Sequence, residues 1–315
     1  MTAPGSTGRI GVAVASGMLK GVYGHGVLAA FEERGLRAHV YGTASSSALS
    51  GGLAAVGRAR RTGVAYWTGA AAAAADKGMS SVVLDSIAEY GPTLREGLFR
   101  PGAPEFLLAT SKVTDPAAAE TTQGPDAKAL GRQLLRNVFA GDRSWVDEHL
   151  ATVVFSSRAG SGGQERLLTP DNYDAVSYAS TRMLHAWAIP AEIDGEAYVD
   201  ASYTCSCPAR EVAAKGVAVL VAIGCDPFPL FRDLYASEEI VDGSVLNGAR
   251  VLVVKPDDDL KNLGVDYAAA TSEGLLKAYE LGQDAGHRFV DRHTELLGSA
   301  APEPDAGTEA READA

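Results

Sequence analysis

The hydrophobic positions of the chain form short apolar runs that alternate with longer amphipathic segments. The runs at 9–16 ("RIGVAVAS") and 38–42 ("AHVYG") predict buried strands, and the segments at 21–35 and 47–61 predict the helices that follow them. Gly35 is placed to close the first of these helices. Such a βαβα opening is typical of an α/β fold with a mostly parallel central sheet between layers of helices.

Further apolar runs continue this pattern toward the C-terminus. They predict four more strands and a long C-terminal helix, at 151–157, 196–202, 217–224, 250–256 and 267–297 respectively. The middle of the chain, about 62–150, is instead rich in predicted helix and has an irregular loop near 114–125. We expect this part to be an insertion, which either covers a site as a lid or only extends the fold.

Composition is consistent with one folded domain between two flexible ends. The chain has 315 residues, of which 46% are hydrophobic and 22% charged, so it is long enough to bury one large core. We expect a flexible N-terminus over 1–8, a single α/β domain over 9–298 and a disordered acidic tail over 299–315. The last fifteen residues contain five acids, one arginine and no bulky apolar residue.

The net charge of −12 argues against two classes of partner. An acidic surface repels the phosphates of nucleic acid and the headgroups of an anionic membrane. No apolar run approaches the length that spans a bilayer, and none precedes the first strand as a leader, so we expect a soluble, cytoplasmic protein without stable membrane insertion. A homo-oligomer remains open.

Three cysteines and six histidines offer little metal chemistry. Cys205, Cys207 and Cys225 are odd in number and lack CxxC spacing, so we interpret them as small buried residues, with a metal or disulfide role as the alternative. The histidines show no spacing typical of ligands. We therefore expect no metal site and no cofactor.

Two loops with small residues follow the first two predicted strands, at 15–21 and 42–48. Ligands of open α/β sheets bind outside the carboxyl ends of strands, so these loops are the candidate site. The glycines of the first loop could bind a phosphate, but their spacing is not GxGxxG and the second strand ends without an acid for a ribose.

The second loop contains three serines in the sequence TASSS, at 43–47. Small residues around a central Ser45 are typical of a nucleophile elbow, in which a serine occupies a sharp turn between strand and helix. The alternative is that the serines only cap the following helix, which is the role we expect for Ser47.

The opening "SGMLKGVYGHGVLAAFEERGLRAHVYGTASSSAL" resembles the start of patatin-like phospholipases, whose motifs are G-G-G-x-[RK]-G and G-x-S-x-G-A. Aligning Lys20 and Gly21 with the basic residue and the glycine of the first motif places Ser45 on the catalytic serine without a gap. Downstream, "EAYVDAS" resembles the strand and D-G-[GA] motif of the family, which places Asp200 on the catalytic aspartate and Pro208 on a later proline.

The resemblance covers roughly 9–57 and 151–226 and implies a patatin-like three-layer fold with a Ser–Asp dyad. It implies an acyl hydrolase or acyl transferase that acts on an ester or thioester through a covalent acyl-enzyme on Ser45, and the acidic surface favours a soluble lipid-like or biosynthetic substrate. The remaining roles that it implies are oxyanion donors at Gly17, Met18 and Ser46, loop support by Ser16, Lys20 and Gly21, and an acyl pocket with Leu19 and Leu49. Lys20 could alternatively be a solvated charge.

Several glycines of the family motifs are absent from this chain. Ser16-Gly17-Met18 replaces the three glycines, residues 43–47 lack both glycines of the elbow, and Asp200-Ala201-Ser202 replaces D-G-G. None of the replacements adopts a positive φ as readily as glycine. The site is thus either reshaped for an unusual substrate, or silent and kept to bind an acyl ligand or a protein partner. A triad that adds His287 or His293 is a further alternative.

Overall fold

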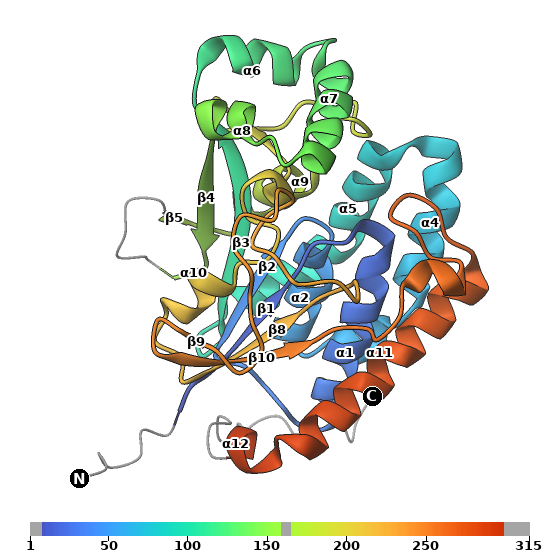
Figure 1. Ribbon diagram of the computed structural model, residues 1–315, viewed down its shortest axis with the longest axis vertical. Helices are drawn as coiled ribbons and strands as arrows, with labels where there is room; N and C mark the ends of the chain where they lie inside the picture. The colour runs from blue at the N-terminus through green and yellow to red at the C-terminus, as the bar shows by residue number, and fades with distance from the viewer. Residues whose placement is uncertain (1–7, 159–164, 299–315) are drawn as a thin grey trace.

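The computed structural model describes residues 8–158 and 165–298 and shows a mixed α/β fold around a ten-stranded, mostly parallel sheet (Figure 1). Its strands are β1 (Ile10–Val14), β2 (Val40–Ala44), β3 (Glu105–Val113), β4 (Leu150–Ser156), β5 (Glu165–Leu167), β6 (Glu192–Ile193), β7 (Glu196–Val199), β8 (Val219–Ile223), β9 (Val245–Leu246) and β10 (Ala249–Val254). The main order is β5-β4-β3-β2-β1-β8-β10-β9, and β7 joins β3 and β6 beside it. The five strands from β3 to β10 in this order are parallel.

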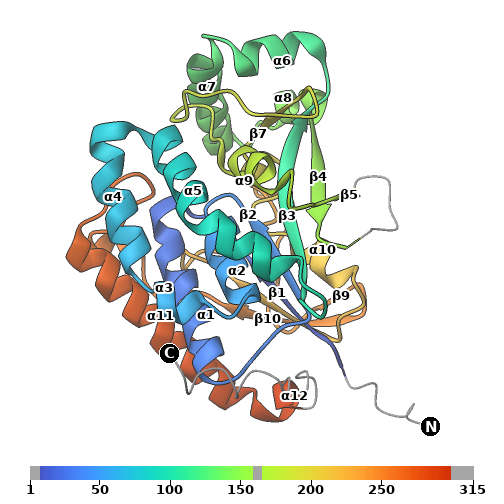
Figure 2. The same ribbon diagram turned by 180° about the vertical axis from the view of Figure 1, so that it is seen from behind.

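Helices cover the sheet unevenly. They are α1 (Gly21–Glu33), α2 (Ser47–Ala55), α3 (Ala59–Thr62), α4 (Ala65–Lys77), α5 (Met79–Leu98), α6 (Pro116–Gln123), α7 (Ala127–Ala140), α8 (Ser144–His149), α9 (Tyr173–Thr181), α10 (Ala209–Ala213), α11 (Ser272–Arg292) and α12 (Thr294–Gly298), with short 3-10 helices η1 (Met18–Lys20), η2 (Ala201–Tyr203) and η3 (Leu260–Leu263). α11 lies along α1, α5 packs on α2, and α4 lies beside α5 and α11, as Figures 1 and 2 both show.

The two faces of the sheet carry side chains of different size, as β1 illustrates. Val12 and Val14 belong to the larger hydrophobic core, whereas Ala13 between them belongs to a second core of smaller residues on the side of α10. On that side Gly11 and Gly42 let α10 approach the strands closely, because an added Cβ on either would lie 2.3 or 2.4 Å from Val212. The chain that leads from β7 into α10, and carries Asp200, is thereby held at the carboxyl ends of β1 and β2.

The strands and helices expected at both ends of the domain are confirmed, with bounds that differ by a few residues. Two expectations need correction. The segment 62–150 does contain α4 to α8, but it also contains β3, which pairs with β2 and β4 and is an integral part of the sheet. The helix expected over 47–61 is two helices, α2 and α3, because Gly57 adopts a φ of 71° between them. Residues 1–7 and the tail 299–315 lie outside the described part of the chain.

Candidate active site

Ser45 lies at a sharp turn between β2 and α2, with a φ of 53°. A non-glycine residue in this left-handed region costs about 1–2 kcal/mol, and such strain is characteristic of a nucleophile elbow. Ser47 secures the turn: its Oγ accepts the Ala44 N–H at 2.9 Å and lies 2.9 Å from the Val14 carbonyl oxygen. The expectation that Ser47 caps α2 is therefore wrong, since its hydroxyl bonds back to the strands.

The missing elbow glycines do not conflict with the backbone. Thr43 lies in β2 and Ser47 is the first residue of α2, and neither has a positive φ, so neither position requires glycine. Space for the larger Thr43 comes from the neighbouring helix: a Cβ added to Gly51 would lie 2.2 Å from Thr43 Cγ2. The motif has a glycine at position 43. In this protein Gly51 of α2 instead leaves the space that the Thr43 side chain fills.

Ser45 Oγ donates a hydrogen bond of 2.7 Å to Asp200 Oδ2, and both side chains are buried. The other carboxylate oxygen, Oδ1, accepts the Ser202 N–H at 2.7 Å. Burial raises the pKa of Asp200 to about 6, and the hydrogen bonds from Ser202 and Ser45 lower it only in part. A carboxylate with this pKa is ionised at neutral pH and basic enough to take a proton from a serine hydroxyl.

Serine side chains connect the two halves of the site, and of these serines only Ser16 was given a role by the sequence analysis. The backbone N–H of Ser45 donates to Ser180 Oγ of α9 at 2.9 Å. Ser16 Oγ lies 2.8 Å from Ser202 Oγ and 2.7 Å from Ser206 Oγ, so it ties the 15–21 loop to the Asp200 segment. The family motifs give no signal for these contacts, because a glycine at position 16 or 202 has no hydroxyl.

The loop before α1 supplies backbone N–H groups beside Ser45. Gly17 donates its N–H to Ser46 Oγ at 3.1 Å, so this donor is already engaged. Within the described residues, no acceptor is found for the N–H groups of Met18 and Ser46. Met18 has a φ of 46°, and Gly17 packs so tightly on Cys225 that an added Cβ would lie 2.4 Å from its Sγ.

Lys20 is fully buried and makes ion pairs with Asp226 and Asp259, the second at 2.8 Å. Its ammonium group also lies 4.6 Å from the ring centroid of Tyr267, whose carbonyl oxygen accepts the Leu19 N–H at 3.2 Å. Burial alone would lower the pKa of Lys20, but the two carboxylates outweigh this effect and the pKa is raised. Lys20 is thus a paired internal charge that fixes the loop, and the alternative of a solvated charge is wrong.

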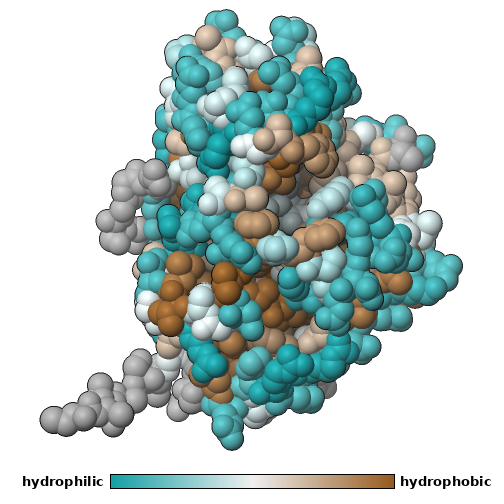
Figure 3. All heavy atoms as spheres, in the orientation of Figure 1, coloured by the Kyte–Doolittle hydropathy of each residue, from teal (hydrophilic) through white to brown (hydrophobic). Residues whose placement is uncertain are grey.

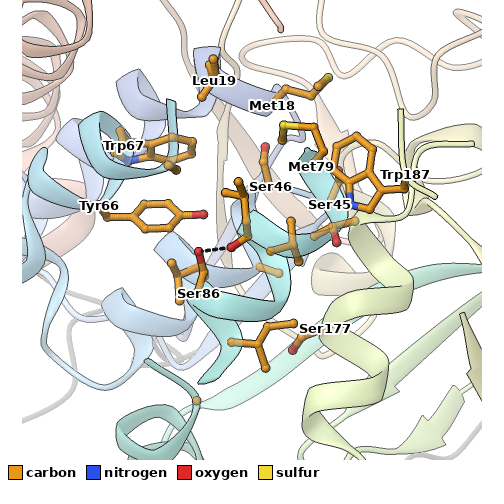
Figure 4. Close-up of a pocket in the computed structure, with 18 of the residues that line it drawn as sticks. Met18, Leu19, Ser45, Ser46, Tyr66, Trp67, Met79, Ser86, Ser177 and Trp187 are labelled. Atoms are coloured by element: carbon orange, nitrogen blue, oxygen red, sulfur yellow. Dashed lines mark hydrogen bonds between the residues drawn. The ribbon is translucent and has the colours of Figure 1, made fainter. Parts of the chain in front are cut away.

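A largely apolar pocket of about 750 Å³, including its open mouth, leads to Ser45. Leu19 and Leu49, both expected to contact an acyl group, line it. Figure 4 shows Ser45 and Trp187 on one side of the pocket and Tyr66 and Trp67 on the other. Most of the remaining lining comes from α4, α5 and α9, namely Ala70, Met79, Val82, Val83, Ser86, Ile87, Gly91, Leu94, Tyr173, Ser177 and Thr181.

Residues of the segment 62–150, which was expected either to cover a site as a lid or only to extend the fold, therefore supply much of the pocket wall. In Figure 3, hydrophobic residues gather beside a hollow near the middle of the visible face, between the regions that carry α9 and α5 in Figure 1. Gly21 keeps one wall of the pocket in place, because a Cβ there would lie 2.9 Å from the Trp67 ring.

The alternative chemistries fit the structure less well. His287 bonds to Glu33 on the outer side of α11, and His293 packs on Phe289, so neither lies in the pocket beside Ser45. All three cysteines are buried and free. Across 8–158 and 165–298 no group of three or more histidine, cysteine or acidic side chains could hold a metal ion. None of the described helices is both long and apolar enough to cross a membrane.

Comparison with known proteins adds no family assignment. No protein-family model matches the chain, and a search of curated proteins finds no significant match. The chemistry of the site must therefore be inferred from its geometry and from the motifs in its own sequence.

Proposed function

We propose that this protein is a serine acyl hydrolase or acyl transferase of the patatin-like kind, with Ser45 as nucleophile and Asp200 as its base. The observation that carries the proposal is the 2.7 Å hydrogen bond from Ser45 Oγ to Asp200 Oδ2, made by a serine at a positive φ that lines an apolar pocket. A buried serine and aspartate in this relation are poised for proton transfer, which is the first requirement of nucleophilic catalysis.

In the proposed reaction Asp200 Oδ2 takes the proton of Ser45 Oγ as this oxygen attacks the carbonyl carbon of an ester or thioester. The tetrahedral intermediate collapses with cleavage of the bond to the alcohol or thiol, and Asp200 returns the proton to the leaving oxygen or sulfur. Water, or an acceptor alcohol or thiol, then attacks the acyl-enzyme in the same way and releases Ser45.

The negative charge of the intermediate needs hydrogen-bond donors near Ser45. The N–H groups of Met18 and Ser46 are the candidates, because neither has an acceptor among the described residues and both residues line the pocket. One donor of this kind typically contributes about 10²–10³ in rate. The N–H of Gly17 could join them only if its bond to Ser46 Oγ opened.

That bond is also the observation that favours the second candidate, a silent site that binds an acyl group without cleaving it. If Gly17 must keep its bond to Ser46, the site has one donor fewer than the family motifs imply. The bond is 3.1 Å long and is made by a neutral hydroxyl, so a developing oxyanion should compete with it successfully.

Hydrolysis of p-nitrophenyl esters from acetate to dodecanoate tests the proposal. We expect saturable turnover of one or more of these esters by the unmodified protein, and a loss of at least about 10³-fold in kcat in Ser45→Ala and Asp200→Asn. Ser50→Ala, a buried serine of α2 outside the dyad, should retain activity. Absence of turnover across the whole series, with a folded protein, would favour the silent binding site.

A further inference from the structure

The apolar pocket contains two polar atoms that the protein leaves without partners. Trp187 Nε1 and Ser177 Oγ are both buried, both residues line the pocket, and neither atom has a hydrogen-bond partner. Ser177 lies near the phenol of Tyr173, but the two do not meet at hydrogen-bonding geometry. A buried polar group without a partner costs about 1–3 kcal/mol, so each such group calls for an explanation.

Trp187 is held firmly in its place at the pocket wall. Its backbone N–H donates to the Met183 carbonyl oxygen at 3.0 Å. The two residues that follow it, 188 and 189, donate their N–H groups to Ser80 Oγ of α5 at 2.9 and 3.2 Å. Trp187 is 3% exposed, so its indole is shielded from bulk water.

Ser177 lies on α9, the same helix whose Ser180 contacts the nucleophile Ser45. It precedes Ser180, whose Oγ holds the Ser45 N–H, by three residues, which is about one helical turn or roughly 5 Å along the axis. Because Ser177 also lines the pocket, its hydroxyl would lie beside the chain of an acyl group bound there. Trp187, seen on the same side of the pocket as Ser45 in Figure 4, offers a second donor there.

We propose that the acyl group accepted by this pocket is oxygenated, with a hydroxyl or oxo group on the chain that accepts a hydrogen bond from Trp187 Nε1 or bonds to Ser177 Oγ. Indole N–H is a donor only, whereas a serine hydroxyl both donates and accepts, so a hydroxyl or carbonyl oxygen on the substrate can pair with either atom. A plain alkyl chain would leave both atoms unpaired in an apolar environment. This inference rests on the proposed function, whose acyl pocket it describes.

Ligand binding to Ser45→Ala tests the inference without requiring turnover. Calorimetric titration compares methyl octanoate with methyl octanoates that carry a hydroxyl or an oxo group at carbon 3, 4, 5 or 6. We expect at least one oxygenated ester to bind about tenfold more tightly than methyl octanoate. Equal or weaker binding of all the oxygenated esters would overturn the inference and leave an internal water as the partner of these atoms.

Second-site variants in the Ser45→Ala background identify the donors. Trp187→Phe or Ser177→Ala, whichever removes the partner of the substrate oxygen, should reduce the preference for the oxygenated ester several-fold while leaving the affinity for methyl octanoate nearly unchanged. Val83→Ala, which alters an apolar wall residue, should change both affinities by a similar factor. A preference that persists in both donor variants would also overturn the inference. Failure of the unmodified protein to hydrolyse esters would instead count against the proposed function alone.

Discussion

Replacing Asp200 by asparagine should stabilise the fold at neutral and alkaline pH, although it should abolish activity. Asparagine keeps the shape of the side chain: its oxygen can still accept the Ser202 N–H, and its amide can donate to Ser45 Oγ. What it removes is a buried negative charge, which burial makes costly. Residues that serve chemistry at the expense of stability are common in active sites.

The size of this effect follows from the pKa of Asp200, which burial raises from an ordinary value of 3.8 to about 6. The folded state therefore binds the proton more tightly than the unfolded chain, so this group destabilises the fold increasingly as pH rises from about 4 to above 6. At about 1.36 kcal/mol per unit of pKa, the penalty approaches 3 kcal/mol at pH 8 and is about 1.6 kcal/mol at pH 5.

Urea unfolding followed by circular dichroism at pH 5, 6, 7 and 8 measures the difference between the two proteins. We expect the advantage of Asp200→Asn to grow by about 1.4 kcal/mol from pH 5 to pH 8. Asp171→Asn, at an exposed position before α9, is the control and should show no comparable trend. A stability difference that is independent of pH, or that shrinks as pH rises, would refute the account of Asp200 as a buried charge.

Three further predictions concern catalysis and packing. First, kcat/KM should fall about tenfold per pH unit below about 6, because the base form of Asp200 is required; a flat profile from pH 5 to 8 would exclude it as the base. Second, Gly51→Ala should cost about 1–3 kcal/mol in the free energy of unfolding, and clearly less in a Thr43→Ser background that lacks the clashing methyl; a double-mutant cycle with no coupling would contradict this contact. Third, Lys20→Met should cost about 2–4 kcal/mol by urea unfolding, whereas Lys277→Met, at an exposed ion pair, should have a much smaller effect; equal effects would contradict the view that burial makes the Lys20 ion pairs important for stability.

The sequence predicts the parts of this fold whose signal is local. β1, β2, β8 and β10 lie in largely apolar runs, and Gly35 follows the end of α1, so each can be recognised in its own segment. The sequence pattern does not predict β3, although its run "FLLA" is apolar. Strong helical patterns surround this run, and no nearby residue indicates that it pairs with β2 and β4.

The same distinction applies to the candidate site. The spacing of small residues and the family motifs suffice to predict Ser45 and Asp200 as partners, and the structure brings them within 2.7 Å. The pocket wall formed by Trp187 and Ser177 could not be predicted in this way. It depends on how α5 and α9 pack against each other, over distances along the chain that no motif spans.

The central claim, an activated serine at position 45, is tested most directly by intact mass spectrometry after treatment with a fluorophosphonate probe. Unmodified protein, Ser45→Ala and Ser46→Ala are compared under the same conditions, with folding verified by circular dichroism. We predict one adduct on the unmodified protein and on Ser46→Ala, and none on Ser45→Ala. An adduct that persists in Ser45→Ala, or no adduct on any of the three folded proteins, would contradict the claim.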